Sequence, residues 1–176
     1  RMYGFPRHIN FHRNFPAYWE KDDHDTLSDD CWPGMDPEFM RPLTFADGLR
    51  LFRQQVPMGE GPTYRTYRWG KDFQIWLVEG RDYRSPNPDP DGPEKSIWGA
   101  EQKAWLKRTM LDSDATWKVL ISPTPLVGPD RARKRDNHAN AAFATEGDEI
   151  RHWLAQNLPT NAFIACGDRH WQYHSV

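Results

Sequence analysis

The sequence predicts an α/β fold in which a sheet and its helices form a layered sandwich. Three nearly continuous apolar runs, at residues 73–80, 117–125 and 161–168, are typical of strands covered on both faces. Segments with apolar residues at helical spacing lie between these runs. The resulting order of strand, helix, strand, helix, strand over residues 73–167 is that of an α/β sandwich.

The first predicted element along the chain is a helix that begins at Thr44. Asp47 follows this threonine by three residues, which is the spacing of a capping box. The apolar residues of this helix share one face: Phe45, Leu49, Phe52 and Val56. The next segment, "TYRTYRW" at residues 63–69, alternates in polarity and is expected to be an edge strand.

The elements of the predicted sandwich follow in order. Strand 73–80 leads to a helix over residues 99–111. The apolar residues of that helix form a loose stripe: Ala100, Ala104, Met110 and Leu111. Strand 117–125 leads to a helix over residues 145–158, which again has an acid three residues after its first threonine. Strand 161–168 completes the series.

Two connections between these elements are long. Residues 81–97 are rich in Pro, Asp and Gly, and residues 123–144 contain the stretch "GPDRARKRDNHANAAF". Loops of this length are uncommon in compact domains unless they form sites or lids. The alternative is a pair of solvated surface loops.

Composition excludes several classes of protein. Nine Trp and an aromatic content of 14% argue against disorder, and a net charge of -2 gives no reason to expect nucleic-acid binding. No stretch approaches the roughly 18 apolar residues of a membrane-spanning helix. The cysteines, Cys31 and Cys166, are too few for a disulfide framework, and Cys166 is expected to be a buried thiol. The chain begins with Arg1 and carries no signal peptide, so it is expected to be a processed chain or a fragment of unstated compartment.

Acidic and imidazole side chains follow the apolar runs. "DDHD" at residues 22–25 comes after a short apolar stretch, and Asp168 and His170 follow the last predicted strand. Ligands of open α/β sheets sit at the carboxyl ends of the strands, so these clusters are expected to meet at one rim. Carboxylates suit hard cations, and imidazole adds affinity for transition metals. Taken alone, residues 22–25 could be a solvated turn with a capping role, and a single D-x-H such as Asp168 and His170 is common by chance.

Four segments resemble the PhoD-like branch of the calcineurin-type metallophosphoesterases. They are "YWEKDDHDTLSDD", "YRTYRWGKDFQIWLVEGRDYRSPN", "WGAEQKAWLKRTMLDSDATWKVLISPTPL" and "NAFIACGDRHW". The resemblance covers essentially the whole chain but only the later part of the family domain. It implies that residues 1–176 form an incomplete sandwich of the metallophosphoesterase type, truncated at both ends, because the upstream G-D-x-x-[DY] block and the strands after the last block are missing.

The resemblance implies a role for individual residues. Asp22, Asp23, Asp168 and His170 correspond to the metal-binding blocks of the family. His24 corresponds to the histidine that contacts the substrate phosphate and protonates or stabilises the leaving oxygen.

Two further residues are matched to substrate binding, Arg81 and His138, although an arginine beside carboxylates is more often part of a structural ion pair. Glu79 departs from the family, which carries Asp at this place, and so does the pair Asp29–Asp30, where the family has Asn.

The function implied by the resemblance is metal-dependent hydrolysis of phosphate monoesters or diesters by a metal-bound hydroxide. The cofactors it implies are two or more metal ions, iron and calcium, the partner is a small phosphate ester, and the location is secreted or periplasmic. One alternative is a non-catalytic, aromatic-rich module that binds carbohydrate or another ligand, and another is an inactive fragment. Four tryptophans on apolar faces are expected in the core and speak against the module: Trp76, Trp105, Trp117 and Trp153.

Overall fold

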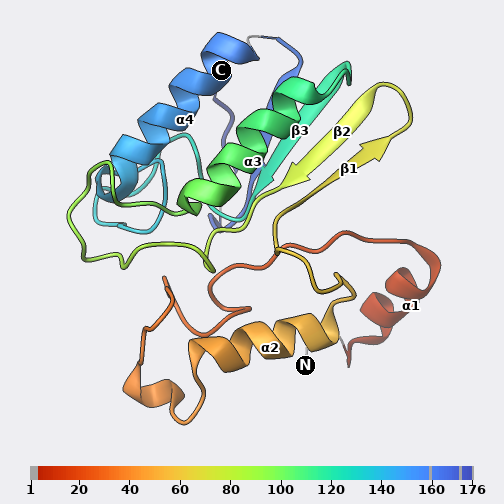
Figure 1. The fold of residues 1–176 in the computed structure, drawn as a ribbon. Coiled ribbons are helices and arrows are strands. Elements are labelled where there is room, and N and C mark those ends of the chain that lie inside the picture. The colour runs from red at the N-terminus through yellow and green to blue at the C-terminus, as the bar shows by residue number, and fades with distance from the viewer. Residues whose placement is uncertain (1–3, 159, 171, 176) are drawn as a thin grey trace.

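A four-stranded sheet carries two helices on one of its faces (Figure 1). The computed structural model describes residues 4–158, 160–170 and 172–175. The strands lie in the order β1-β2-β3-β4. Their bounds are Arg65–Trp69 for β1, Phe73–Leu77 for β2, Trp117–Ser122 for β3 and Ala162–Cys166 for β4. β1 and β2 form an antiparallel hairpin, whereas β2, β3 and β4 are parallel, so the predicted α/β class is confirmed.

The helices agree with the predicted segments, and additional ones appear. Their bounds are Pro6–Asn14 for α1, Phe45–Gln55 for α2, Gly99–Asp112 for α3 and Ala144–Asn157 for α4, with 3-10 turns η2 at Glu38–Met40 and η3 at Ala141–Phe143. Both hydrogen bonds of the capping box predicted at Thr44 and Asp47 are present: each side chain accepts from the backbone N–H of the other residue. None of the described helices is long and apolar enough to cross a membrane.

The predicted cap at Thr145 is wrong. Helix α4 begins one residue earlier, directly after η3, with Phe143 at the cap position and no side-chain cap. The backbone N–H and hydroxyl of Thr145 both donate to the Asp91 carboxylate instead, at 3.0 and 2.8 Å. A side chain from the long loop 81–97 therefore satisfies the first turn of the helix, and sequence spacing alone does not show such a partner.

The main core lies between the sheet and helices α3 and α4. Trp76 and Leu120 project from the strands onto this face. The helices supply four buried apolar side chains: Leu106, Met110, Ile150 and Leu154. Both connections between parallel strands pass over the same face, as right-handed crossovers require when strand order follows chain order. Trp105 and Trp153 pack against this core, so Trp76, Trp105 and Trp153 are placed as predicted.

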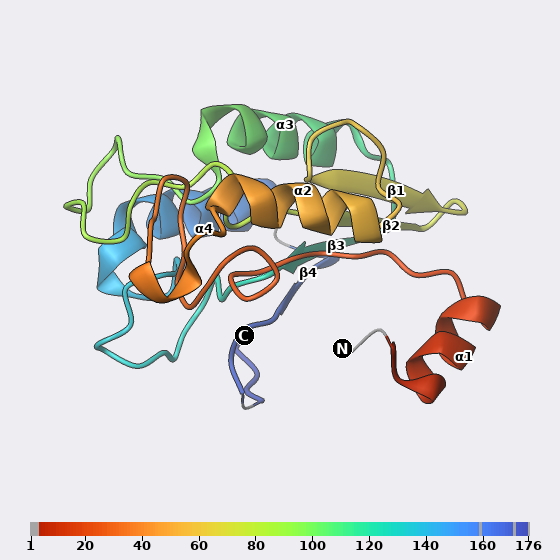
Figure 2. The same cartoon turned by 90° about the horizontal axis from the view of Figure 1, so that it is seen from below.

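The β4 side of the sheet is open, which corrects the expectation that all three strands are covered on both faces. Trp117 is 44% exposed, and its ring lies against that of Phe163, itself 56% exposed. Cys166 is exposed rather than buried. Trp117 points to the face opposite Leu120, and helices α3 and α4 both lie on the Leu120 face, while β4 is an edge strand (Figures 1 and 2).

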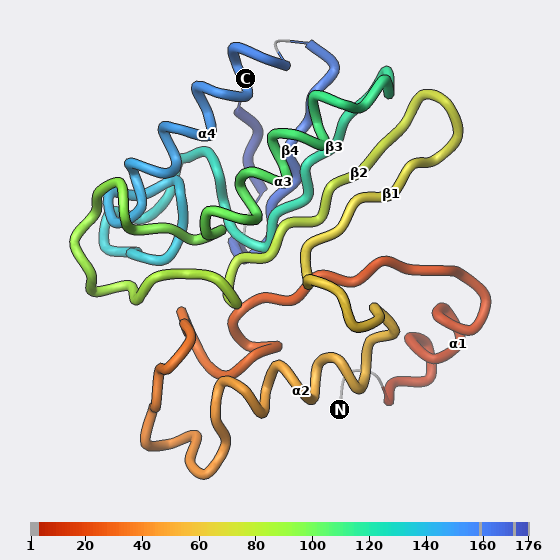
Figure 3. Tube along the Cα trace, viewed as in Figure 1, coloured from red at the N-terminus to blue at the C-terminus, as the bar shows by residue number. Residues whose placement is uncertain are grey.

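The N-terminal part of the chain lies beneath the carboxyl ends of β2 and β3 (Figures 1 and 3). Residues 16–22 are extended but form no strand, although the sequence led us to expect one before Asp22. A side-chain contact from Arg65 to the Trp19 carbonyl fixes this segment beside β1, where backbone pairing would have made a strand. A second, small core of Leu27, Cys31 and Phe45 joins the turn that follows to α2.

Candidate metal centre

The turn at residues 22–30 is organised around the Asp23 carboxylate. Its oxygens accept hydrogen bonds from the backbone N–H groups of His24 and Asp30, at 2.7 and 2.8 Å. The backbone carbonyl of Asp23 accepts hydrogen bonds from the N–H groups of Thr26 and Leu27, at 2.9 and 2.8 Å. Aspartate favours turns because its short side chain bonds nearby backbone in this way. Asp23 is thus held in place, 5% exposed, by its own turn.

Asp168 reaches this turn from the end of β4. It has a positive φ of 68°, which turns the chain sharply after the strand. The preceding Gly167 donates its N–H to the Ser122 carbonyl at 3.1 Å, and a β-carbon there would lie 3.0 Å from the Pro123 carbonyl oxygen. The ends of β3 and β4 are therefore close together because residue 167 has no side chain.

Carboxylate oxygens of Asp22, Asp23 and Asp168 lie within 4.8 Å of one another. The prediction that the two acidic clusters meet at one rim is confirmed for these three residues. Three carboxylates at this spacing are the donor set that a hard cation prefers, so the residues present fit such an ion.

Burial of this group shifts the protonation of its members. The pKa of Asp22 is raised to about 6, because burial and the charge of Asp23 together outweigh the opposing charge of Arg81. The pKa of Asp168 is raised by burial and by the charge of Asp136. Carboxylates that repel one another in this way are stabilised by a bound cation, which supplies the missing positive charge.

A second group shares Asp23 and adds nitrogen. Ligand atoms of Asp23, His24 and Asp29 also lie within 4.8 Å of one another. His24 Nε2 is 3.9 Å from Asp29 Oδ1, and the two side chains are 75% and 73% exposed. Mixed oxygen and imidazole donors suit a transition metal. Asp23 is therefore positioned to contribute to two adjacent ion sites.

Arg81 and Arg169 alternate with the carboxylates of the site. Arg81 is fully buried, and its Nε lies 2.6 Å from Asp22 Oδ1, with Nη2 3.9 Å from both Asp23 and Asp136. Burial alone would lower the pKa of Arg81, but the charge of Asp22 raises it. The guanidinium of Arg169 lies 3.0 Å from Asp168 and 3.2 Å from Asp136. Both arginines hold the carboxylates in place.

Lys21 attaches the N-terminal segment to the end of β2. Its ammonium, buried at 1% exposure, lies 3.0 Å from Glu79 and 2.7 Å from Asp82 and donates to the Thr26 hydroxyl at 3.1 Å. Glu79, the departure from the family pattern, is thus the partner of this lysine. The neighbouring Glu20 has its pKa raised to about 9 by burial and then by Glu79 and Asp22. A neutral Glu20 adds no further charge to the site near neutral pH.

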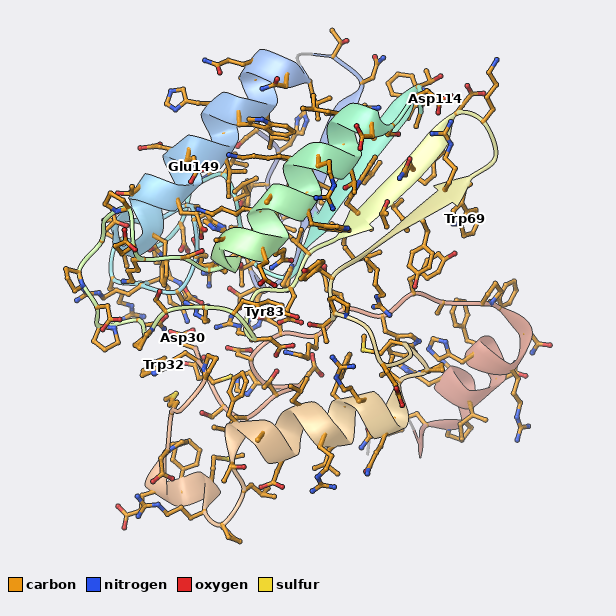
Figure 4. All side chains as sticks on the ribbon, in the orientation of Figure 1. Asp30, Trp32, Trp69, Tyr83, Asp114 and Glu149 are labelled. Atoms are coloured by element: carbon orange, nitrogen blue, oxygen red, sulfur yellow. The ribbon has the colours of Figure 1, made fainter. Side chains whose placement is uncertain are left out.

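The long loop 123–144 contributes residues that sequence reasoning missed. Lys134 lies 2.7 Å from Asp30 and 3.8 Å from Asp136. Asp30, labelled in Figure 4, has its pKa raised to about 6 by burial and by a hydrogen bond with Asp136. Asp130 pairs with Arg169 at 3.0 Å. The charged stretch "GPDRARKRDN" indicates in the sequence that this loop carries many charges, but it does not indicate which residue each charge pairs with.

His138 and His170 are placed differently from the cluster. The ring of His138 is fully buried, with Nε2 2.9 Å from Glu146 Oε2 and an edge contact to Trp98. Its predicted contact with substrate stays a prediction. His170 is exposed and joins neither of the two groups found among the described residues, so its role as a metal ligand also stays a prediction.

Glu146 fastens both long loops to helix α4. Besides His138, its carboxylate accepts hydrogen bonds from the Ser96 hydroxyl and from the Ile97 N–H at 2.5 Å. Burial alone would raise the pKa of Glu146, but the hydrogen bond and charge of His138 outweigh it and lower the pKa to about 2. Figure 3 traces both loops to the N-terminal end of α4. The loops that frame the site are therefore ordered by one buried carboxylate.

Comparisons with known proteins agree with this arrangement. A family model described as PhoD-like phosphatase matches residues 6–175. A solved structure of PhoD matches with a TM-score of 0.68 and 17% sequence identity, over 85% of this chain. The chain spans 33% of the length of that structure. No curated protein matches the chain.

Proposed function

The chain belongs to the PhoD-like phosphatase family, and on that premise we propose that it carries part of the site of a metal-dependent phosphoesterase. Phosphate ester hydrolysis is the general activity of the family, and small phosphate esters, monoesters or diesters, are the substrates we propose. The observation that carries the proposal is the meeting of Asp22, Asp23 and Asp168 from opposite ends of the chain.

We assign a calcium-type cation to Asp22, Asp23 and Asp168 and an iron-type cation to the carboxylates of Asp23 and Asp29, with His24 beside this second ion as the proton donor. Both groups offer carboxylate oxygens within 4.8 Å of one another, the donor type that hard cations prefer, and we propose iron for the second ion because the family resemblance implies iron beside calcium. When bound, such cations neutralise the phosphoryl oxygens and lower the pKa of an attacking water.

The other side chains of the site donate a proton or position the carboxylates. His24, at the exposed edge of the site, donates a proton to the leaving oxygen of the ester. Arg81 is a positioning residue, because its guanidinium is fully buried among carboxylates. Arg169 has the same role at the β4 end. Lys21 holds the turn that carries Asp23 against β2, so that the carboxylates remain close without a bound ion.

The test measures ion binding and hydrolysis separately. Calorimetric titration with Ca²⁺ is expected to show binding by the wild-type protein that Asp168→Asn weakens at least tenfold, because the variant loses a charged oxygen ligand. Hydrolysis of p-nitrophenyl phosphate and of bis(p-nitrophenyl) phosphate is expected to stop on chelation and to return when Ca²⁺ and iron are restored. Hydrolysis that persists after complete removal of metal, or a wild-type protein that binds no Ca²⁺, would contradict the proposal.

A further inference from the structure

A cavity of about 290 Å³ lies between the 22–30 turn and helix α2, beside the candidate metal centre. His24 forms part of its wall. The same histidine belongs to the group of Asp23 and Asp29 whose ligand atoms lie within 4.8 Å of one another. The cavity therefore opens next to the place where the proposed function puts the leaving oxygen of the ester.

The shape of the cavity is set by a close backbone contact. A β-carbon at Gly48 would overlap the Thr26 carbonyl oxygen, so the helix packs directly against the turn at this point. The capping box of Thr44 and Asp47 fixes the start of the same helix. Two rigid segments thus meet at Gly48 and separate on either side of it, which leaves a formed cavity beside the contact.

The lining of the cavity is mostly apolar. Its apolar side chains come from the turn, from η2 and the residues after it, and from α2: Leu27, Met40, Leu43, Leu51 and Phe52. No lysine or arginine is among the described residues that line it, whereas Asp25 contributes a carboxylate. A second anionic group on the substrate would be repelled, while an uncharged apolar group would be removed from water.

We infer that this cavity binds the alcohol part of the phosphate ester and selects for a small, uncharged, apolar group such as an aryl or short alkyl chain. The volume is near the lower end of the roughly 300–1,000 Å³ of small-molecule sites, which fits a group of this size. The inference rests on the proposed function, since it places the phosphoryl group at the carboxylates and the alcohol beyond His24.

Two phosphate monoesters with leaving alcohols of similar acidity, methyl phosphate and benzyl phosphate, test the selection. We expect kcat/KM of the metal-loaded protein to be at least about tenfold higher for benzyl phosphate, the least that one methylene is worth in an apolar pocket. Leu51→Gln is expected to reduce this ratio about threefold or more. Leu51 is 38% exposed, so the substitution leaves the fold intact. The matched control is Leu111→Gln on α3, where a leucine 55% exposed lies outside the cavity and the ratio should be unchanged.

A binding measurement separates this inference from the proposed function. Saturation-transfer NMR with benzyl alcohol reports on the cavity without any hydrolysis, and Leu51→Gln but not Leu111→Gln should weaken the signal. Binding with this variant pattern in a protein that hydrolyses neither ester would support the cavity and overturn the proposed function. Hydrolysis of both esters with no preference, and no effect of Leu51→Gln on either measurement, would overturn the cavity and leave the proposed function standing.

Discussion

Two histidine–carboxylate pairs of this chain stand in opposite surroundings. His138 and Glu146 are 0% and 1% exposed and lie 2.9 Å apart. His24 and Asp29 are 75% and 73% exposed and lie 3.9 Å apart. Both pairs join an imidazole to a carboxylate, so the difference in burial decides what each pair does.

The buried pair links the two long loops to helix α4. A carboxylate removed from water needs hydrogen-bond donors, and Glu146 accepts hydrogen bonds from Ser96 and Ile97 in addition to His138. The exposed pair is held weakly, because surface ion pairs contribute only about 0–1 kcal/mol. His24 is therefore free to exchange Asp29 for the leaving oxygen of a substrate, as a proton donor must.

The largest effect should come from His24→Ala. We expect turnover of p-nitrophenyl phosphate to fall roughly 10²–10⁴-fold, the usual contribution of a general acid. The free energy of unfolding should change by less than about 0.5 kcal/mol, because the side chain is 75% exposed. Asp168→Ala is the companion variant, and it should lose bound metal together with turnover. Metal analysis and urea unfolding of both variants check this.

An opposite result would change the comparison. If His24→Ala lost as much metal as Asp168→Ala, His24 would be a ligand and not the proton donor. If it instead lowered the free energy of unfolding by several kcal/mol, the exposed pair would be as structural as the buried one.

A smaller effect, on stability, is expected for Glu146→Gln. A hydrogen bond to a charged group contributes about 1.5–3 kcal/mol, and Glu146 accepts several, so urea unfolding at pH 7 should show a loss of at least this order. The matched control on the same helix is Glu149→Gln. Glu149 is 43% exposed and pairs with Lys103 and Lys107 at 2.9 and 2.6 Å, and its loss should cost less than about 1 kcal/mol.

The pH dependence of the same variant carries a definite sign. The pKa of Glu146 is lowered in the folded protein to about 2 from 4.5, so its contribution to stability is complete above about pH 4.5. That contribution is lost as pH falls toward 2, because the unfolded chain then binds the proton more readily. The stability difference between wild type and Glu146→Gln should therefore shrink over this range. A constant difference down to pH 2 would mean that packing, not charge, links the loops to α4.

The sequence was sufficient where the signal is local. The apolar runs located β2, β3 and β4, and the spacing of Thr44 and Asp47 predicted the α2 cap. The position of Asp168 after a strand placed it at the carboxyl edge of the sheet, and Asp22 and Asp23 meet it there although the segment before them forms no strand.

Pairing across long distances along the chain was not predictable in this way. Lys21 and Arg81 find their carboxylate partners 58 and 59 residues away, and Lys134 finds Asp30 across 104 residues. The sequence alone does not show which residue a charged side chain pairs with, or whether that side chain is buried. The prediction that Trp117 lies in the core is wrong for a related reason, because an apolar strand residue is buried only if another element covers it.

The smallest effect is expected for Asp29→Asn, and it sharpens the comparison most directly. Asp29 is 73% exposed, and Lys134 Nζ and His24 Nε2 each lie 3.9 Å from it, so in metal-free protein its loss should change the free energy of unfolding by less than about 0.5 kcal/mol. In the presence of Fe²⁺ under anaerobic conditions the two proteins should differ, because a ligand bound only to the folded state adds stability in proportion to its affinity. A tenfold weaker site at saturating metal corresponds to about 1.4 kcal/mol, measurable as a smaller metal-induced rise in the urea midpoint. An equal rise in both proteins would show that Asp29 holds no ion and that the exposed pair is an ordinary surface contact.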